Sequence, residues 1–299
     1  MNSTVTPSVQ SMTTNATEPE RDPDYVLVVI YSVVLLSGTI SLSLMIHIIR
    51  SSKTSLTSIA VLNLIFTHFI FLLTVPFRIY YYAIAEWNLD REWCKVVSSM
   101  IHIHMYMSFI FYVIILITRL SSFYHKAERE TSFRRIHALL VSSVVWIVVL
   151  ISVPCILSLS YGKSVNNGSS ENQQCFKFGS SINAGARAIN YIVSTVIIVV
   201  ATVLTALQAN VLRILYRTHH QGCISQQDFG AQLKSLCFAL IMVVCFIPYH
   251  LFRMYYVKHI DDWEHFNEVF LSLTTLNCLD MLTFLGRRTC YMCLPGQAA

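Results

Sequence analysis

The sequence predicts an all-α membrane protein: a seven-transmembrane helix bundle with its N-terminus outside the cell. Hydrophobic residues make up 55% of the 299 residues and charged residues only 12%, whereas a soluble domain has about 25% charged residues. The apolar residues gather in seven runs, each long enough to cross about 30 Å of hydrocarbon. These runs do not alternate polar and apolar positions, which favours helices over strands.

The seven runs follow one another along the whole chain. We expect spans near Tyr25–Ile49, Ser58–Ala83, Cys94–Tyr124, Ile136–Leu159, Asn183–Tyr216, Phe229–Val257 and Phe266–Leu285. The third, fifth and sixth are longer than an upright span needs, so they are expected to tilt or to protrude from the membrane. The predicted organisation is an extracellular segment 1–24, a bundle 25–285 and a short cytoplasmic tail 286–299.

The connections between the runs differ in charge, and this difference predicts the orientation. The first, third and fifth connections and the tail hold Arg50, Lys53, Lys126, Arg129, Arg134, Arg135, Arg213, Arg217, Lys234, Arg287 and Arg288. Loops rich in Lys and Arg stay in the cytoplasm, and an odd number of spans then leaves the N-terminus outside. Three N-glycosylation sequons, at Asn2, Asn15 and Asn167, all fall on the predicted outer side.

Two of the nine cysteines lie clearly on the predicted outer side: Cys94, at the start of the third span, and Cys175, in the loop before the fifth. Because the cell exterior is oxidising, a Cys94–Cys175 disulfide is expected, with two free thiols as the alternative. Cys290 and Cys293 follow the seventh span on the predicted inner side. Reversible palmitoylation is one interpretation of this pair, and unmodified thiols are the other.

Several other protein classes lack support in the sequence. The basic residues sit in short clusters without interleaved aromatic residues, so no nucleic-acid partner is expected. An internal repeat, which is typical of transporters, is not found, and the seventh span has no lysine for a retinal Schiff base. His102 and His104 are two residues apart and point to different faces of a helix. We therefore expect no metal, no cofactor and no enzymatic activity.

A single arginine, Arg119, marks the end of the third span. It lies 25 residues after Cys94, which corresponds to about 37 Å of helix at about 1.5 Å per residue. The two residues are therefore expected at opposite membrane faces, with Arg119 at the inner one. The alternative is that Arg119 is an interfacial anchor that extends its charge toward the lipid headgroups.

Further landmarks occur in order along the chain: Leu62-Asn63-Leu64, Trp87, Cys94, Arg119, Trp146, Cys245-Phe246-Ile247-Pro248 and Asn277-Cys278-Leu279-Asp280. In this order and on these helices they resemble the rhodopsin-like (class A) G-protein-coupled receptors over nearly the whole chain. The resemblance implies a multi-pass receptor of the plasma membrane that transduces an extracellular signal to heterotrimeric G proteins.

Within that family the chain resembles the branch of purinergic nucleotide and lipid-mediator receptors, and within the branch one orphan subtype. The branch is indicated by Leu73–Arg78, by Phe246–Arg253 and by Asp280 in the seventh helix. The subtype is indicated by His102-Ile103-His104-Met105-Tyr106, Cys175-Phe176-Lys177-Phe178, Gln232-Leu233-Lys234 and Pro248–Tyr256.

The resemblance also assigns two working parts, and the chain departs from the family at one of them. Cys245, Phe246 and Pro248 correspond to the hinge of the sixth helix, and a proline inside a helix bends it. The G-protein coupling motif reads Thr118-Arg119-Leu120 instead of Asp-Arg-Tyr. Without the neighbouring acid the inactive state should be less restrained, which favours basal activity. The opposite expectation is a poorly stabilised active state. The alternative function is a constitutively active or signalling-silent seven-helix receptor that acts as a scavenger or scaffold.

A second departure falls at the site where related receptors hold a sodium ion. His68 stands in place of the aspartate of the second helix, while Ser108 and Asp280 occupy the other positions. Imidazole is a poor ligand for a hard cation, so no sodium effect on agonist binding is expected. One hypothesis is that His68 pairs with Asp280 and takes over the bridging role of the ion. The alternative is a neutral His68 that is hydrogen-bonded to backbone or water.

The predicted outer pocket is better supplied with cations than with acids. Ile101 occupies the position where amine receptors carry an aspartate. The arginine fork binds phosphate and carboxylate bidentately, so we expect a small anionic molecule or a lipid as the ligand. For each arginine the alternative is a contact with membrane lipid headgroups. The candidate pocket residues are Arg78, Tyr81, His102, Tyr106, Arg187, His250 and Arg253.

Overall fold

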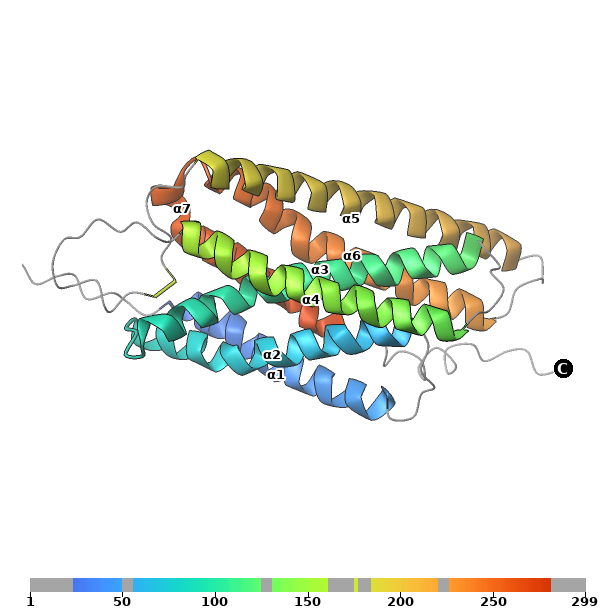
Figure 1. Cartoon of the computed structure of the whole chain (residues 1–299), viewed down its shortest axis with the longest axis horizontal. Coiled ribbons are helices and arrows are strands. Elements are labelled where there is room, and N and C mark those ends of the chain that lie inside the picture. Colours follow the sequence, from blue (N-terminus) through green and yellow to red (C-terminus); the bar gives the residue numbers. More distant parts are fainter. Residues whose placement is uncertain are drawn as a thin grey trace, which may run out of the picture.

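The computed structural model describes residues 24–49, 56–124, 131–160, 175–176, 184–219 and 226–280, and within these ranges it contains seven α-helices. Six of them are long and apolar enough to cross a membrane, and Figure 1 shows the helices lying lengthwise beside one another. The all-α, seven-helix prediction is confirmed. The helices are α1 Tyr25–Ile49, α2 Leu56–Ile84, α3 Arg91–Tyr124, α4 Thr131–Ser160, α5 Ala184–His219, α6 Gln226–Tyr256 and α7 Ile260–Thr274.

The last helix begins earlier than the sequence predicted. We expected the seventh span near Phe266–Leu285, whereas α7 begins at Ile260. The helix kinks at Trp263 (φ −125°, ψ 17°), and residues 275–280 continue from its end as a 3₁₀ helix.

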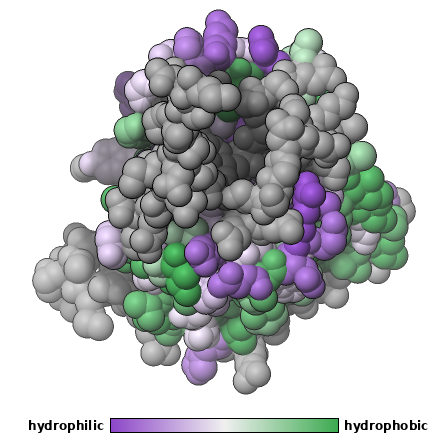
Figure 2. Space-filling view, turned by 90° about the vertical axis from the view of Figure 1, so that its left-hand side faces the viewer, coloured by the Kyte–Doolittle hydropathy of each residue, from purple (hydrophilic) through white to green (hydrophobic). Residues whose placement is uncertain are grey.

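Helix α3 lies at the centre of the bundle. It packs against α2, α4, α5 and α6, and most of its residues from Val97 to Tyr112 are buried. By contrast, large apolar side chains on the outer helices face outward; Leu36 on α1 is 66% exposed and Val244 on α6 is 69% exposed. An outward apolar surface of this kind suits lipid. In the end view of Figure 2, hydrophilic residues show at the top and in the lower half of this face, and a hydrophobic group lies along its right-hand edge.

Side-chain hydrogen bonds and one close backbone approach join the helices. The Trp146 indole on α4 donates to the Asn63 amide oxygen on α2 at 2.9 Å, and the Asn63 amide nitrogen donates to the Ser142 hydroxyl at 3.2 Å. Gly38 brings α1 close to α2, since a Cβ at this position would lie 2.9 Å from a methyl group of Leu72. These contacts fix the position of α2, which carries the buried polar residues His68 and Arg78.

Candidate functional site

One end of the bundle is closed by the predicted disulfide. Cys94, in the first turn of α3, is bonded to Cys175, with a Cα–Cα distance of 5.9 Å, which confirms the pairing. We call this end the disulfide end. Phe176 follows the bond with a φ of 65°, and its ring is buried against Tyr81 and Trp87, with centroid distances of 5.0 and 5.7 Å. The disulfide thus holds an aromatic side chain inside the bundle.

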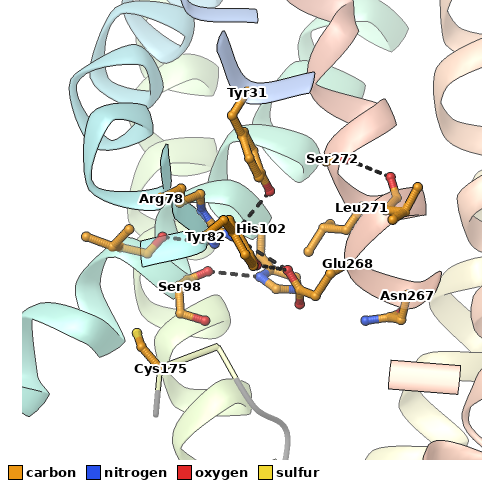
Figure 3. Close-up of polar contacts among 12 residues, drawn as sticks. Tyr31, Arg78, Tyr82, Ser98, His102, Cys175, Asn267, Glu268, Leu271 and Ser272 are labelled. Atoms are coloured by element: carbon orange, nitrogen blue, oxygen red, sulfur yellow. Dashed lines mark hydrogen bonds and ion pairs between the residues drawn. The ribbon is translucent and has the colours of Figure 1, made fainter. Parts of the chain in front are cut away.

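Beneath Phe176 lies a buried ion pair between α2 and α7. The Arg78 guanidinium is 3.6 Å from the Glu268 carboxylate and lies 4.3 Å from the centroid of the Phe176 ring. The Tyr82 hydroxyl donates to Glu268 at 3.1 Å, and Arg78 donates to the Tyr31 hydroxyl at 3.3 Å. Figure 3 shows these side chains pointing toward one another. Arg78, a predicted ligand contact, is therefore already engaged with an acid of the protein.

Glu268 was not among the predicted site residues. The sequence indicated only an acid near a helix start, and the span limits placed it close to the membrane surface. The sequence feature that could have pointed to a partner such as Glu268 is Arg78 itself, because an ionisable residue within a span is generally paired with another polar group. Glu268 is 7% exposed, because its side chain points into the bundle toward Arg78 and Tyr82.

Arg253 occupies a second cationic position at the disulfide end, among α5, α6 and α7. Its guanidinium donates to the Tyr249 hydroxyl at 3.0 Å, to the Asn190 side-chain oxygen at 3.1 Å and to the Asn267 side-chain oxygen at 3.5 Å. Its residue exposure is 8%, against 1% for Arg78. The structure thus brings neutral oxygen atoms from three helices around a charged fork.

The other predicted pocket residues divide into buried and exposed ones. The His102 Nδ1–H group donates to the Ser98 carbonyl oxygen at 3.1 Å. His250 Nδ1 lies 3.2 Å from the Ser194 hydroxyl. Tyr81 is buried and Tyr106 is half-buried, whereas Arg187 is exposed in the first turn of α5. A separate hollow on the surface beside the start of α3 contains none of these residues; it is lined by Leu89, Asp90, Glu92, Trp93 and Val96.

A second polar cluster lies deeper in the bundle. His68 Nε2 is 3.3 Å from the Asp280 carboxylate, which also accepts a hydrogen bond from the Tyr112 hydroxyl. The other ring nitrogen of His68 is 2.8 Å from His104 Nε2. The structure therefore brings His68 and Asp280 together, as in the pairing hypothesis. The sequence interpretation missed Tyr112 and His104 as partners, although His104 lies one helical turn before the buried Ser108.

The predicted hinge is connected to this deeper cluster. Pro248 lies inside α6 and is exposed on its outer side, while Cys245 is half-buried. Phe246 is fully buried, and its ring contacts Phe109 and Tyr112 with centroid distances of 5.7 and 6.2 Å. Because Tyr112 donates to Asp280, a movement of α6 at the hinge would act on the polar cluster through two side chains.

The predicted G-protein contact lies at the opposite end of α3. Arg119 is half-buried and Leu120 is buried. The Thr118 hydroxyl donates to the Ile114 carbonyl oxygen of its own helix at 2.7 Å. The predicted glycosylation sites Asn2, Asn15 and Asn167 and the predicted lipidation sites Cys290 and Cys293 lie outside the described residues.

The family model of the 7 transmembrane receptor (rhodopsin family) matches residues 38–281. The chain belongs to this family of G-protein-coupled receptors: non-enzymatic, multi-pass proteins typical of the plasma membrane, for which the family implies coupling to heterotrimeric G proteins.

Relatives from human and mouse support the same assignment. The chain is 35% identical over 269 residues to "Probable G-protein coupled receptor 141" of Homo sapiens, covering 87% of each chain; this is the orphan subtype that the sequence motifs indicated. It is 26% identical over 277 residues to "Probable G-protein coupled receptor 34" of Mus musculus, covering 87% of this chain and 72% of the relative. Identity to "Lysophosphatidic acid receptor 4" of Homo sapiens is 28% over 266 residues, covering 83% and 70%.

Proposed function

We propose that this receptor binds a small anionic molecule or an anionic lipid at the disulfide end, with Arg253 as the principal counter-charge, and that the disulfide end faces the cell exterior. The ligand class includes nucleotides, lysophospholipids and carboxylate lipids. The observation that carries the proposal is the Arg253 guanidinium, held among three helices by the oxygen atoms of Tyr249, Asn190 and Asn267.

The two buried arginines differ in how an anion would meet them. An anion at Arg78 would compete with the Glu268 carboxylate, 3.6 Å away. The Arg253 guanidinium donates hydrogen bonds to neutral oxygen atoms of Tyr249, Asn190 and Asn267. An anion bound there would accept charge-assisted hydrogen bonds from the guanidinium, and such bonds are roughly twice as strong as neutral ones. One of the relatives is named for lysophosphatidic acid, a ligand of the proposed class.

The position of Arg253 also suggests how binding is transmitted. Arg253 lies five residues after Pro248 on α6, so a ligand that draws it toward α5 and α7 acts on the segment beyond the hinge. An agonist that prefers the state open at the Arg119 end shifts the population toward that state. Arg119 then becomes accessible to a G protein.

The proposal is tested by measuring agonist-stimulated nucleotide exchange on G proteins in membranes that contain the full chain. The probes are lysophosphatidic acid, a nucleoside diphosphate and a long-chain fatty acid, applied to the unmodified receptor and to Arg253→Gln. Loss of a hydrogen bond to a charged group costs about 1.5–3 kcal/mol. The active probe is therefore expected to need a concentration about 10 to 100 times higher on Arg253→Gln.

Arg187→Gln is the matched control, because Arg187 is an arginine of the same end but exposed on α5. Its response is expected to equal that of the unmodified receptor. The proposal is wrong if the active probe works equally well on Arg253→Gln, or if Arg187→Gln alone loses the response.

Basal signalling separates a working receptor from a silent scavenger or scaffold. With no probe added, nucleotide exchange is compared between the unmodified receptor and Arg119→Ala. A lower rate for Arg119→Ala supports transduction through Arg119. Equal background rates for both proteins, together with silence toward every probe, favour the scavenger or scaffold.

A further inference from the structure

Three side chains that can bind metal converge in the deeper polar cluster. They come from three helical segments: His68 from α2, His104 from α3 and Cys278 from the 3₁₀ helix that follows α7. All three are buried, with residue exposures of 1, 1 and 2%. One nitrogen or sulfur atom from each lies within 4.8 Å of the others. The sequence indicated no such group, since these residues are far apart along the chain.

The distances between these atoms fit a small tetrahedral ion. Bonds of about 2.0–2.1 Å from zinc to histidine nitrogen and about 2.3 Å from zinc to cysteine sulfur place two tetrahedral nitrogen ligands about 3.3 Å apart, and nitrogen and sulfur about 3.6 Å apart. The Cys278 sulfur is 3.6 Å from His68 Nδ1 and 3.5 Å from His104 Nε2. The two nitrogens are 2.8 Å apart, so they would need to separate by about 0.5 Å.

A hydrogen bond on the far side of the His68 ring prepares its nitrogen for a metal. His68 Nε2 lies 3.3 Å from Asp280, and a proton on Nε2 leaves the lone pair of Nδ1 directed at His104 and Cys278. Metal-binding histidines commonly donate their other N–H to a carboxylate, which fixes the ring and strengthens the ligand. The Tyr112 hydroxyl, which donates to the same carboxylate, holds Asp280 in place.

The charges of such a site also balance. A metal ion binds the cysteine as thiolate, so the S–H bond of Cys278 breaks, a metal–sulfur bond forms, and the proton leaves to water. A divalent ion, the Cys278 thiolate and the Asp280 carboxylate then sum to zero charge, whereas a buried net charge would be costly. A sodium ion fits poorly, because hard cations require oxygen ligands.

We propose that His68, His104 and Cys278 form a transition-metal site whose best-matched ion is Zn²⁺. Two imidazoles and a thiolate are the ligands that zinc prefers in proteins, and three protein ligands leave a fourth position for water. The ion would tie α2 and α3 to the end of α7 at the position where related receptors hold sodium. In this receptor a divalent ion bound by nitrogen and sulfur would thus take the place of a monovalent, oxygen-bound ion. The proposal departs from the expectation, drawn from the sequence, that the chain holds no metal.

The test uses the full chain purified in detergent, freed of metal and then incubated with micromolar Zn²⁺. Elemental mass spectrometry is expected to find about one zinc ion per receptor. The isosteric variant Cys278→Ser and the variant His104→Gln are expected to fall to background. Cobalt(II) serves as a second probe, since a thiolate-to-cobalt absorption band is expected for the unmodified receptor and is lost in Cys278→Ser.

Matched controls separate this site from other thiols and imidazoles. His102→Gln changes another buried histidine of α3, and Cys237→Ser changes a free cysteine of α6; both are expected to keep the ion. Folding is checked without metal by thermal unfolding, and Zn²⁺ but not Mg²⁺ or Na⁺ is expected to raise the midpoint of the unmodified receptor by at least about 3 °C.

Two results would overturn the proposal. One is a folded receptor that takes up no stoichiometric zinc. The other is uptake that persists in both Cys278→Ser and His104→Gln, which would place the ion elsewhere, such as at the His265–Asp24 pair of the disulfide end.

Discussion

The two buried polar clusters of this receptor are built from different chemistry. At the disulfide end, Arg78 and Glu268 form an ion pair covered by Phe176 and flanked by tyrosines. Deeper in the bundle, His68 and Asp280 meet a second histidine and a cysteine. An arginine keeps its charge under all physiological conditions, whereas imidazole and thiol groups exchange protons and bind metals. The first cluster is therefore suited to hold helices together, and the second is suited to respond to protons and metal ions.

The largest expected effect comes from breaking the ion pair at the disulfide end. Glu268→Gln removes the carboxylate but keeps the side-chain size, and removing one partner of a buried ion pair costs about 3–5 kcal/mol. Thermal unfolding of the purified receptor measures this loss. The double variant Arg78→Met with Glu268→Leu is expected to recover most of it, because no buried charge remains. A double variant no more stable than Glu268→Gln would show that the pair is not the cause.

A smaller loss is expected in the deeper cluster. Asp280→Asn removes the charge that accepts bonds from His68 and Tyr112, and a hydrogen bond to a charged group is worth about 1.5–3 kcal/mol. The same unfolding measurement gives the value, and a loss larger than that of Glu268→Gln would reverse the comparison between the clusters.

The function of the deeper cluster is tested by His68→Asp, which restores the residue found in related receptors. Agonist potency is expected to become sensitive to Na⁺ in this variant and to be insensitive in the unmodified receptor. Signalling is expected to change as well, because the His68–Asp280 contact is lost. Restored sodium sensitivity with unchanged signalling would argue against a bridging role for His68.

Phe176→Leu tests the cation–π contact between the Phe176 ring and the Arg78 guanidinium. The substitution keeps an apolar side chain but removes the ring that lies 4.3 Å from the guanidinium, and a desolvated cation–π contact is worth up to about 2 kcal/mol. We expect a loss of about 1–2 kcal/mol in the free energy of unfolding. Tyr81→Leu, which removes a ring packed against Phe176 with a centroid distance of 5.0 Å, is the control for general loss of aromatic packing. An equal loss in both variants would exclude a specific cation–π contribution.

The smallest effect is expected outside both clusters. Arg187→Ala changes an exposed side chain at the start of α5, and such changes usually stay within about 0.5 kcal/mol. A larger loss of unfolding free energy would show that Arg187 has a structural contact that its exposure does not suggest.

The sequence supported different parts of the site to different extents. The Cys94–Cys175 bond could be predicted because topology left only two cysteines in an oxidising compartment. The proximity of His68 and Asp280 followed from the family pattern. Glu268 could not be assigned, since the partner of Arg78 depends on where α7 begins and how it is rotated. As a metal ligand, His104 was considered only together with His102, and Cys278 was not considered, because a metal-binding group assembled from three helices has no fixed spacing in the chain.

By itself the sequence determined the fold class, because seven apolar runs of about 20 residues or more satisfy their backbone hydrogen bonds in a membrane as helices. It determined the family through the landmark residues that occur in order along those runs. It also determined which polar residues had to be sheltered inside the bundle, since lipid does not solvate them. Only the tertiary structure decided the partners that the sequence left open: Arg78 with Glu268, Arg253 with Asn190 and Asn267, and His68 with His104 and Cys278. The physical reason is that partner choice depends on the rotation and depth of each helix, which packing between helices sets.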